Sequence, residues 1–191
     1  MNKRKMGPQP MLWPHPTGLV GSIVDGQPDF AAVAWAGVVA GNPAAVAIGL
    51  QPLRHSLRGI YQNKAFSVNV PSIDLVKETD YCGLVSGKDA DKVKDCGFTV
   101  FYGDLKNVPM IEQCPINMEC EAIHFLDLGS HIMVVGKVIQ THLNDDCLTE
   151  GHPDMAKVKP FIFGPGKYYT VGDVFADAFS VGRSLRKKKT K

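Results

Sequence analysis

The residues best suited to binding chemistry lie in three short stretches of this chain. A planar ligand that carries a phosphate needs exposed main-chain groups for its ring edges, a flat side chain beside the ring, and cations or free N–H groups for the phosphate. In the first stretch a tryptophan stands among small residues, so a ring could approach the main chain with the indole beside it. The candidate binding residues of this stretch are Ala32, Val33, Ala34, Trp35, Ala36 and Gly37.

The other two stretches carry groups that could bind the phosphate. A guanidinium, an imidazole and a hydroxyl stand at the expected start of a helix, and a later polar turn offers N–H groups followed by a lysine. These residues are Arg54, His55, Ser56, Ser86, Gly87 and Lys92. Taken singly, each also fits a simpler role, such as a core tryptophan, a helix cap or a solvated lysine.

Several enzyme classes have no motif in this sequence. There is no G-x-G-x-x-G, no phosphate-binding P-loop, no G-x-S-x-G elbow and no H-E-x-x-H. The six histidines are dispersed, and their spacing predicts no metal site. We therefore expect neither hydrolase machinery nor a bound metal.

Composition and charge point to one globular domain over residues 1–191. The chain is 45% hydrophobic and 21% charged, and its net charge of +2 predicts no nucleic-acid partner. Five cysteines, an odd number without a C-x-x-C pair, indicate reduced thiols rather than a disulfide framework, so we expect a cytoplasmic location. The basic run at 183–191 is expected to be a solvated tail.

Residues 31–50 contain no charge over about the length of a membrane helix. Gly41, Asn42 and Pro43 interrupt this segment, and its alanines and glycines favour insertion only weakly. We therefore expect two buried strands joined by a turn, and no membrane partner.

The order of the elements favours a mainly β fold with inserted helices. Three expected strands follow one another before any helical pattern, which favours an antiparallel barrel over a doubly wound fold. Further strands alternate with helices, and Gly129-Ser130 predicts the turn of a long hairpin. The expected strands are 17–24, 29–40, 44–50, 65–71, 115–129, 130–143 and 160–172, the last interrupted at Gly164-Pro165-Gly166; the expected helices are 54–64, 72–83 and part of 86–97.

Taken in order, these stretches resemble the flavin reductase-like family, whose fold is an FMN-binding split barrel, and in particular its flavoredoxin branch. The resemblance runs over about 13–182, from "WPHPTGLVGS" through "FAAVAWAGVVAGNPAAVAIGL", "RHSLRGI" and "SVNVPS" to "KYYTVG". Its most specific part is "DYCGLVSGKDADK".

The resemblance implies a homodimer of Greek-key-like split β-barrels, with one non-covalent FMN per subunit near the interface. It implies that residues 32–39 contact the flavin ring and ribityl chain, and that Arg54, His55 and Ser56 bind the phosphate. Asn69, Ser86, Gly87 and Lys92 match further flavin-binding positions. His131 matches a position beside the ring, where a nicotinamide would approach.

Three positions depart from the family pattern. Relatives commonly have Asn and Met-Thr or Met-Ser where this chain has Asp29, Ala31 and Ala32. A hydroxyl that would bind the flavin is missing at Ala32, and Asp29 would repel a phosphate if it pointed toward it.

Three functions remain open from the sequence. The first is flavoredoxin-like electron transfer between redox protein partners. The second is an NAD(P)H-dependent flavin reductase, in which NAD(P)H is the electron donor. The third is a barrel that binds a nucleotide or a partner without flavin.

Overall fold

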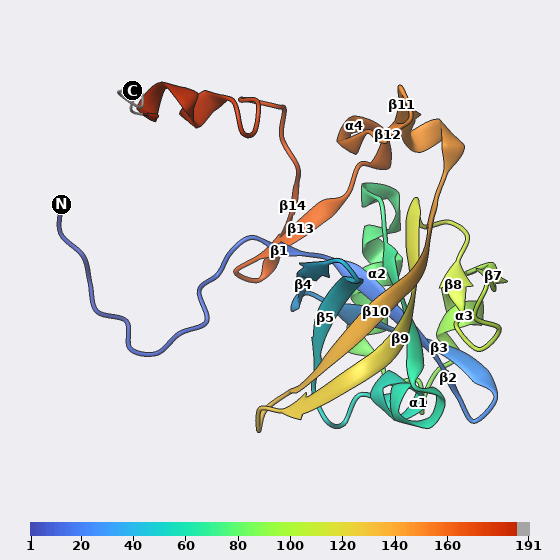
Figure 1. The fold of residues 1–191 in the computed structure, drawn as a ribbon. Coiled ribbons are helices and arrows are strands. Elements are labelled where there is room, and N and C mark those ends of the chain that lie inside the picture. Colours follow the sequence, from blue (N-terminus) through green and yellow to red (C-terminus); the bar gives the residue numbers. More distant parts are fainter. Residues whose placement is uncertain (187–191) are drawn as a thin grey trace.

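The computed structural model describes residues 1–186, and its centre is a seven-stranded antiparallel sheet curled into a split barrel (Figure 1). The strand order is β3-β2-β6-β9-β10-β5-β4, so β3 and β4 form the two edges of the sheet. The strands are β2 (Gly18–Val24), β3 (Gln27–Val33), β4 (Ala36–Gly41), β5 (Ala44–Leu50), β6 (Ala65–Val70), β9 (Ile116–Asp127) and β10 (Ile132–Leu143).

Most of the expected strands and turns are confirmed. Asp25 and Gly26 both have positive φ, at 50° and 84°, which is the backbone of the tight hairpin turn between β2 and β3. The long hairpin is formed by β9 and β10, which pair from Ile116 with Leu143 to Asp127 with Ile132.

The expectation of one strand over 29–40 was wrong. The chain bends at Ala34 and Trp35 and divides the segment into β3 and β4. Because these strands lie at opposite edges of the sheet, the bend crosses the opening of the barrel. The Gly49 N–H donates to the Trp35 carbonyl at 2.7 Å and links the bend to β5.

The expectation of buried strands within 31–50 was only partly right. The turn at Asn42-Pro43 is confirmed, and β5 is largely buried. β4 instead lies on the surface, where Val38 is 80% and Val39 is 55% exposed. No helix among residues 1–186 combines the length and the apolar character that crossing a membrane requires.

Three helices follow the expected pattern. α1 (His55–Asn63) buries Leu57 and Ile60 and packs on β2 at Gly59, where a Cβ would come within 2.5 Å of the Ile23 carbonyl. α2 (Val76–Leu84) and α3 (Lys92–Asp95) lie against β3. The helices therefore leave the edge strand β4 uncovered.

The shorter elements complete the fold. The last predicted strand, 160–172, is divided at its predicted interruption: the chain turns at Pro165 and Gly166 into a hairpin that pairs with β1. These strands are β1 (His15–Pro16), β13 (Phe161–Gly164) and β14 (Lys167–Thr170). The remaining elements are η1 (Ile73–Leu75), β7 (Val100–Phe101), β8 (Met110–Ile111), η2 (Asp145–Cys147), β11 (Leu148–Thr149), β12 (His152–Pro153), α4 (Met155–Val158) and η3 (Val181–Leu185).

Two hydrophobic clusters stabilise this arrangement. The larger lies within the barrel around Ile48, Phe66 and Val134, and the smaller joins Phe30 of β3 to Cys82 of α2. All five cysteines are free, as predicted. The chain ends extend away from the body as two arms (Figure 1), and residues 187–191 of the predicted basic tail lie outside the described residues.

Candidate functional site

The bend between β3 and β4 forms one wall of a pocket of about 400 Å³. This volume is within the range of small-molecule sites. Small side chains at Ala32 and Ala34 leave the main chain of this wall accessible. The lining residues are Ala32, Val33, Ala34, Trp35, Gly49, Leu50, Gln51, Arg54, His131 and Phe163.

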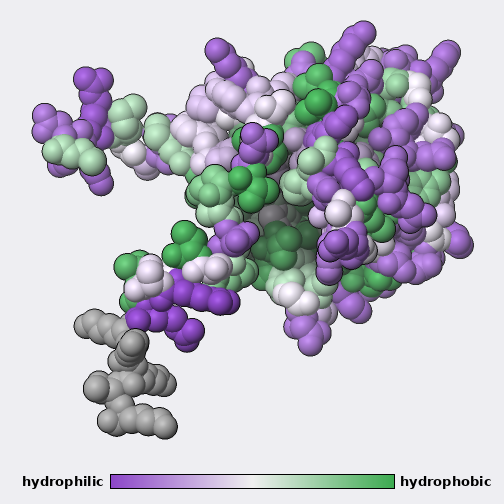
Figure 2. Space-filling model, turned by 90° about the horizontal axis from the view of Figure 1, so that it is seen from above, coloured by the Kyte–Doolittle hydropathy of each residue, from purple (hydrophilic) through white to green (hydrophobic). Residues whose placement is uncertain are grey.

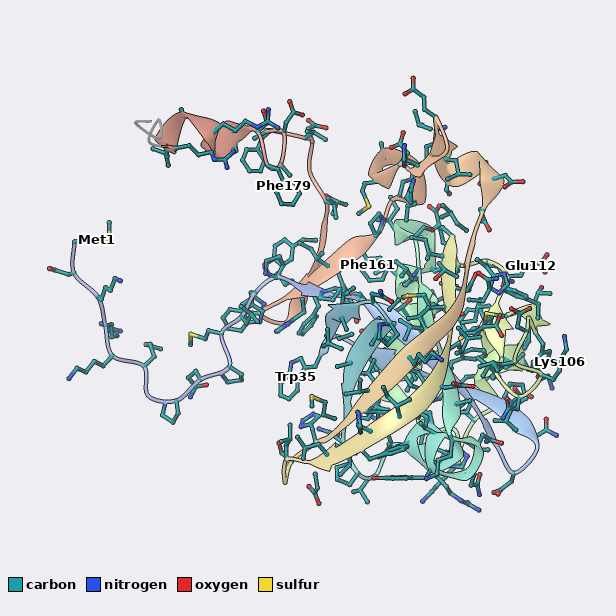
Figure 3. The ribbon with its side chains drawn as sticks, viewed as in Figure 1. Met1, Trp35, Lys106, Glu112, Phe161 and Phe179 are labelled. Carbon is teal, nitrogen blue, oxygen red and sulfur yellow. The ribbon has the colours of Figure 1, made fainter. Side chains whose placement is uncertain are left out.

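Trp35 and His131 form an aromatic pair at this pocket. Their ring centroids are 4.3 Å apart, with 37° between the ring planes. Trp35 is 43% exposed and projects from the bend (Figure 3), so it is not the core residue of the simpler interpretation. The His131 Nδ1 atom lies 3.0 Å from the Ser130 hydroxyl, in the turn between β9 and β10.

The aromatic pair also lines a second, apolar pocket of about 310 Å³. Ala36 and Gly37 of β4 lie in this second pocket, together with Ile48 and Met133. Trp35 and His131 are therefore shared by two adjoining pockets, one with a cation and one lined almost entirely by apolar groups.

Arg54 is the cation of the first pocket. Its Nη1 group donates to the Gly83 carbonyl at 2.9 Å, at the C-terminal end of α2. A guanidinium has five N–H donors, and among the described residues this is its one hydrogen bond to the protein. The remaining N–H groups can therefore bind an anion, and the Gly83 contact holds the side chain in place.

His55, Gly87 and Lys92 lie in a different pocket of about 570 Å³, together with Asp29. The Lys92 Nζ atom is 3.1 Å from Asp29 Oδ1 and donates to the Phe30 carbonyl at 2.7 Å. Both side chains are buried, so the two charges neutralise each other inside the protein. A Cβ at Gly87 would collide with the Asp29 carboxylate, so this close approach requires glycine.

Two buried side-chain atoms of this 570 Å³ pocket have no hydrogen-bond partner among the described residues, Asp29 Oδ2 and His55 Nδ1. The carboxylate oxygen is an acceptor, whereas the imidazole nitrogen donates or accepts according to its tautomer. Asp29 does not line the pocket of Trp35 and Arg54, so its charge does not face that pocket.

Three other predicted residues have structural contacts. Ser56 is fully buried, and its carbonyl accepts a hydrogen bond from the Ser22 hydroxyl at 2.8 Å. The Asn69 amide donates to the Leu19 carbonyl at 2.8 Å and its Oδ1 accepts from the Ile111 N–H at 3.1 Å, which joins β2, β6 and β8. The Ser86 hydroxyl accepts from the Lys88 N–H at 3.2 Å and closes its own turn.

Several lining residues were missed by the sequence analysis. Gly49 and Leu50 end β5, and Gln51 follows the strand three residues before Arg54. Their position at a strand end close to a candidate cation was a usable signal. Phe163 comes from the hairpin near the C-terminus, and no local pattern indicated it.

A buried ionic cluster lies outside these pockets. The Glu119 carboxylate is fully buried and accepts from the Asp104 N–H at 3.1 Å and the Leu105 N–H at 2.6 Å. His142 Nε2 lies 2.7 Å from the same carboxylate. Burial raises the pKa of Glu119, but the hydrogen bonds from His142, Leu105 and Asp104 outweigh it and lower the pKa below 4.5.

Comparisons with known proteins agree on one family. The model of the flavin reductase like domain matches residues 11–172. Flavoredoxin from Methanosarcina acetivorans is 36% identical, with a TM-score of 0.93 over 97% of this chain and 100% of that one. Flavoredoxin of Desulfovibrio vulgaris (Miyazaki F) is 33% identical, with a TM-score of 0.89 over 95% of this chain and 100% of that one. An uncharacterized protein from Archaeoglobus fulgidus is 31% identical over 147 residues, 75% of this chain and 80% of that protein.

Proposed function

This chain belongs to the flavin reductase-like family, and we propose that it binds FMN non-covalently at the split of the barrel and transfers electrons as flavoredoxins do. The observation that carries the proposal is the pocket that places Trp35, His131 and Arg54 around accessible main chain. The likeness to two flavoredoxins over nearly the whole chain supports the same conclusion.

The residues of the pocket fit a flavin. Its ring edges need main-chain N–H and C=O groups, which the small side chains at Ala32 and Ala34 leave accessible. The flat face of the flavin ring can pack against the indole of Trp35, and the FMN phosphate can accept hydrogen bonds from the guanidinium of Arg54. Ala32 provides no hydroxyl, so Arg54 and the main chain carry more of the phosphate binding.

Bound FMN would supply the redox chemistry itself, while the protein orients and shields it. In this proposal the bend at Ala34 and Trp35 positions the ring, and Arg54 anchors the opposite end of the ligand. The paired side chains of Trp35 and His131 would shield one side of the ring from water.

His55, Ser56, Asn69, Ser86, Gly87 and Lys92 remain predicted flavin-binding residues whose contacts with a ligand are untested. For Lys92 the prediction requires a rearrangement, because its amine would have to leave the Asp29 carboxylate to reach a phosphate. We propose that its main part is to neutralise Asp29, which removes the repulsion expected from that residue.

A second function, NAD(P)H-dependent flavin reduction, is favoured by one observation. The apolar pocket beyond the Trp35–His131 pair has a volume of about 310 Å³, so a planar group could lie next to His131. We place electron transfer first because Trp35 occupies the flank of the ring that a nicotinamide would need.

We further propose a homodimer with FMN near the interface, a redox protein as the electron-transfer partner, and a cytoplasmic location. The exposed edge strand β4 supports the dimer, since an uncovered strand of apolar residues is usually paired or covered. The five free cysteines are consistent with a reducing compartment.

The test is a visible spectrum of the purified protein followed by titration with FMN. Flavin absorbance and saturable FMN binding are expected. Absence of binding after reconstitution would overturn the proposal and favour a barrel that binds a nucleotide or partner without flavin. Stopped-flow mixing with NADH or NADPH then separates the two redox functions, because rapid bleaching would identify the reductase.

A further inference from the structure

A fourth pocket, of about 340 Å³, lies at the mouth of the barrel. Its walls are apolar: Val46 and Val68 belong to the sheet, and Met155 and Ile162 belong to the segment that covers the mouth. Figure 2 shows a hollow with hydrophobic walls on this side of the molecule. Thr17 lines this pocket, and its hydroxyl is buried without a hydrogen-bond partner among the described residues. The pocket is therefore an apolar hollow that no residue among 1–186 fills.

The C-terminal arm, defined as residues 171–186, exposes apolar side chains that no part of the described chain covers. It leaves the body after β14 (Figure 1), and its large apolar side chains are exposed to water. Phe175 is 100% and Phe179 is 96% exposed, and Figure 3 shows Phe179 standing away from the body. Hydrogen bonds of the arm, such as that from the Val181 N–H to the Asp177 carbonyl at 3.2 Å, lie within the arm. A row of fully exposed aromatic and aliphatic residues indicates a surface that a partner covers.

The position of the arm agrees with a reciprocal exchange between two copies. Val171, the first residue of the arm, itself lines the pocket, so each arm leaves from the rim of its own pocket. At about 3.3 Å per residue, Phe175 can reach roughly 13 Å from Val171 and Phe179 roughly 26 Å. A twofold axis close to the rim would bring the partner's pocket within that distance. The edge strand β4 supports such an axis, because Val38 lines the pocket and is 80% exposed.

We infer that the C-terminal arm of one copy of this chain docks in the apolar pocket of a second copy, with Phe175 and Phe179 as its anchors. The inference specifies a contact within the homodimer of the proposed function, and it does not depend on bound flavin. Each pocket is incomplete without the partner's arm, and each arm is unprotected without the partner's pocket. The aromatic rings of Phe175 and Phe179 suit an apolar pocket of about 340 Å³, whereas the charged side chains of the arm do not.

The direct test places the photo-crosslinking residue p-benzoylphenylalanine at position 175 of the full chain. Irradiation is expected to give covalent dimers, with a peptide pair that joins residue 175 to the segment 155–162 of the other chain. The same probe at Ile123, a half-exposed position on β9, should give no such pair. Crosslinks within one chain, crosslinks to the N-terminal arm, or no dimer above the Ile123 control would each overturn the inference.

A second experiment measures the dimer dissociation constant by sedimentation. Phe175→Ser and Phe179→Ser should each weaken the dimer about tenfold to a hundredfold, since each removes a buried aromatic side chain. Ile123→Ser is the matched control and should leave the constant unchanged. Unchanged dimerisation in the two arm variants would refute the inference. It would also be refuted if an apolar small molecule bound near Thr17 with the same affinity in the unmodified protein as in the two arm variants. The FMN spectrum of each variant shows separately whether the proposed flavin function holds.

Discussion

The rings of Trp35 and His131 pack against each other at a tilt of 37°, with their centroids 4.3 Å apart, although one residue follows β3 and the other precedes β10. The contact places an indole and an imidazole at the boundary between two pockets at the split of the barrel. It is the structural relationship on which the proposed position of the flavin ring depends most.

The aromatic pair should act as a unit in flavin binding. Trp35→Ala and His131→Ala should each weaken FMN binding, and the double variant should lose less than the sum, with a coupling of about 0.5–1.5 kcal/mol. Flavin fluorescence titration of the four proteins measures this coupling. The melting temperature should change little for Trp35→Ala, because the indole is 43% exposed. Strictly additive losses would show that the pair does not bind the ring together.

Arg54 should recognise the phosphate rather than the ring. Arg54→Ala should weaken FMN binding by about tenfold to a hundredfold, as expected for loss of a charged hydrogen bond. Riboflavin, which lacks the phosphate, should bind this variant and the unmodified protein alike.

Arg58→Ala is the matched control for Arg54. Arg58 lies on the same helix and pairs with Asp25 at 2.8 Å on the surface, where such pairs contribute little. FMN affinity should therefore be unchanged. Equal losses of FMN and riboflavin in the Arg54 variant would exclude a phosphate-specific role.

The buried Asp29–Lys92 pair should be sensitive to removal of one partner. Lys92→Met leaves an uncompensated buried carboxylate and should reduce the free energy of unfolding by about 3–5 kcal/mol. The double variant Asp29→Asn, Lys92→Met should recover most of that loss. Urea unfolding measures both, and a double variant as unstable as the single one would contradict this account.

Glu119 should make stability depend on acid pH. Its folded-state pKa is lowered below 4.5, so the ionised carboxylate stabilises the fold fully above pH 4.5. That contribution is lost as the pH falls through the folded-state pKa. Glu119→Gln should therefore reduce the free energy of unfolding by about 2 kcal/mol at pH 7, and the difference from the unmodified protein should shrink below pH 4.5. A difference that stays constant between pH 7 and pH 3 would argue against the ionised carboxylate as its source.

Local sequence patterns predicted much of the fold. The Asp25-Gly26 turn, helix α1 and the hairpin of β9 and β10 follow from turn chemistry and periodicity, which act over a few residues. The failure at 29–40 has a tertiary cause. The segment has enough strand-forming residues for one strand, but the chain changes its pairing partner within it, from β2 for β3 to β5 for β4. The interruption predicted within 160–172 became a hairpin turn, because β13 pairs with β14.

In the candidate site, too, residue types could be predicted from the sequence but their arrangement in space could not. The residue types at Trp35 and Arg54 were enough to indicate an aromatic flank and a phosphate-binding cation. The sequence could not tell that His55, one residue after Arg54, faces a different pocket, because successive residues at a helix start point in different directions. Nor could it tell that Asn69 is fully used by hydrogen bonds within the core.

Ordered local patterns and turn residues were sufficient to predict the mainly β class and most of the elements, and the resemblance carried by those stretches identified the family. Three relationships depended on the tertiary fold: Ala34 and Trp35 cross the split between two edge strands, the His131 ring packs at a tilt against Trp35, and Lys92 neutralises Asp29. These three relationships join residues far apart in the chain, and strand pairing and burial, rather than local propensity, bring such residues together.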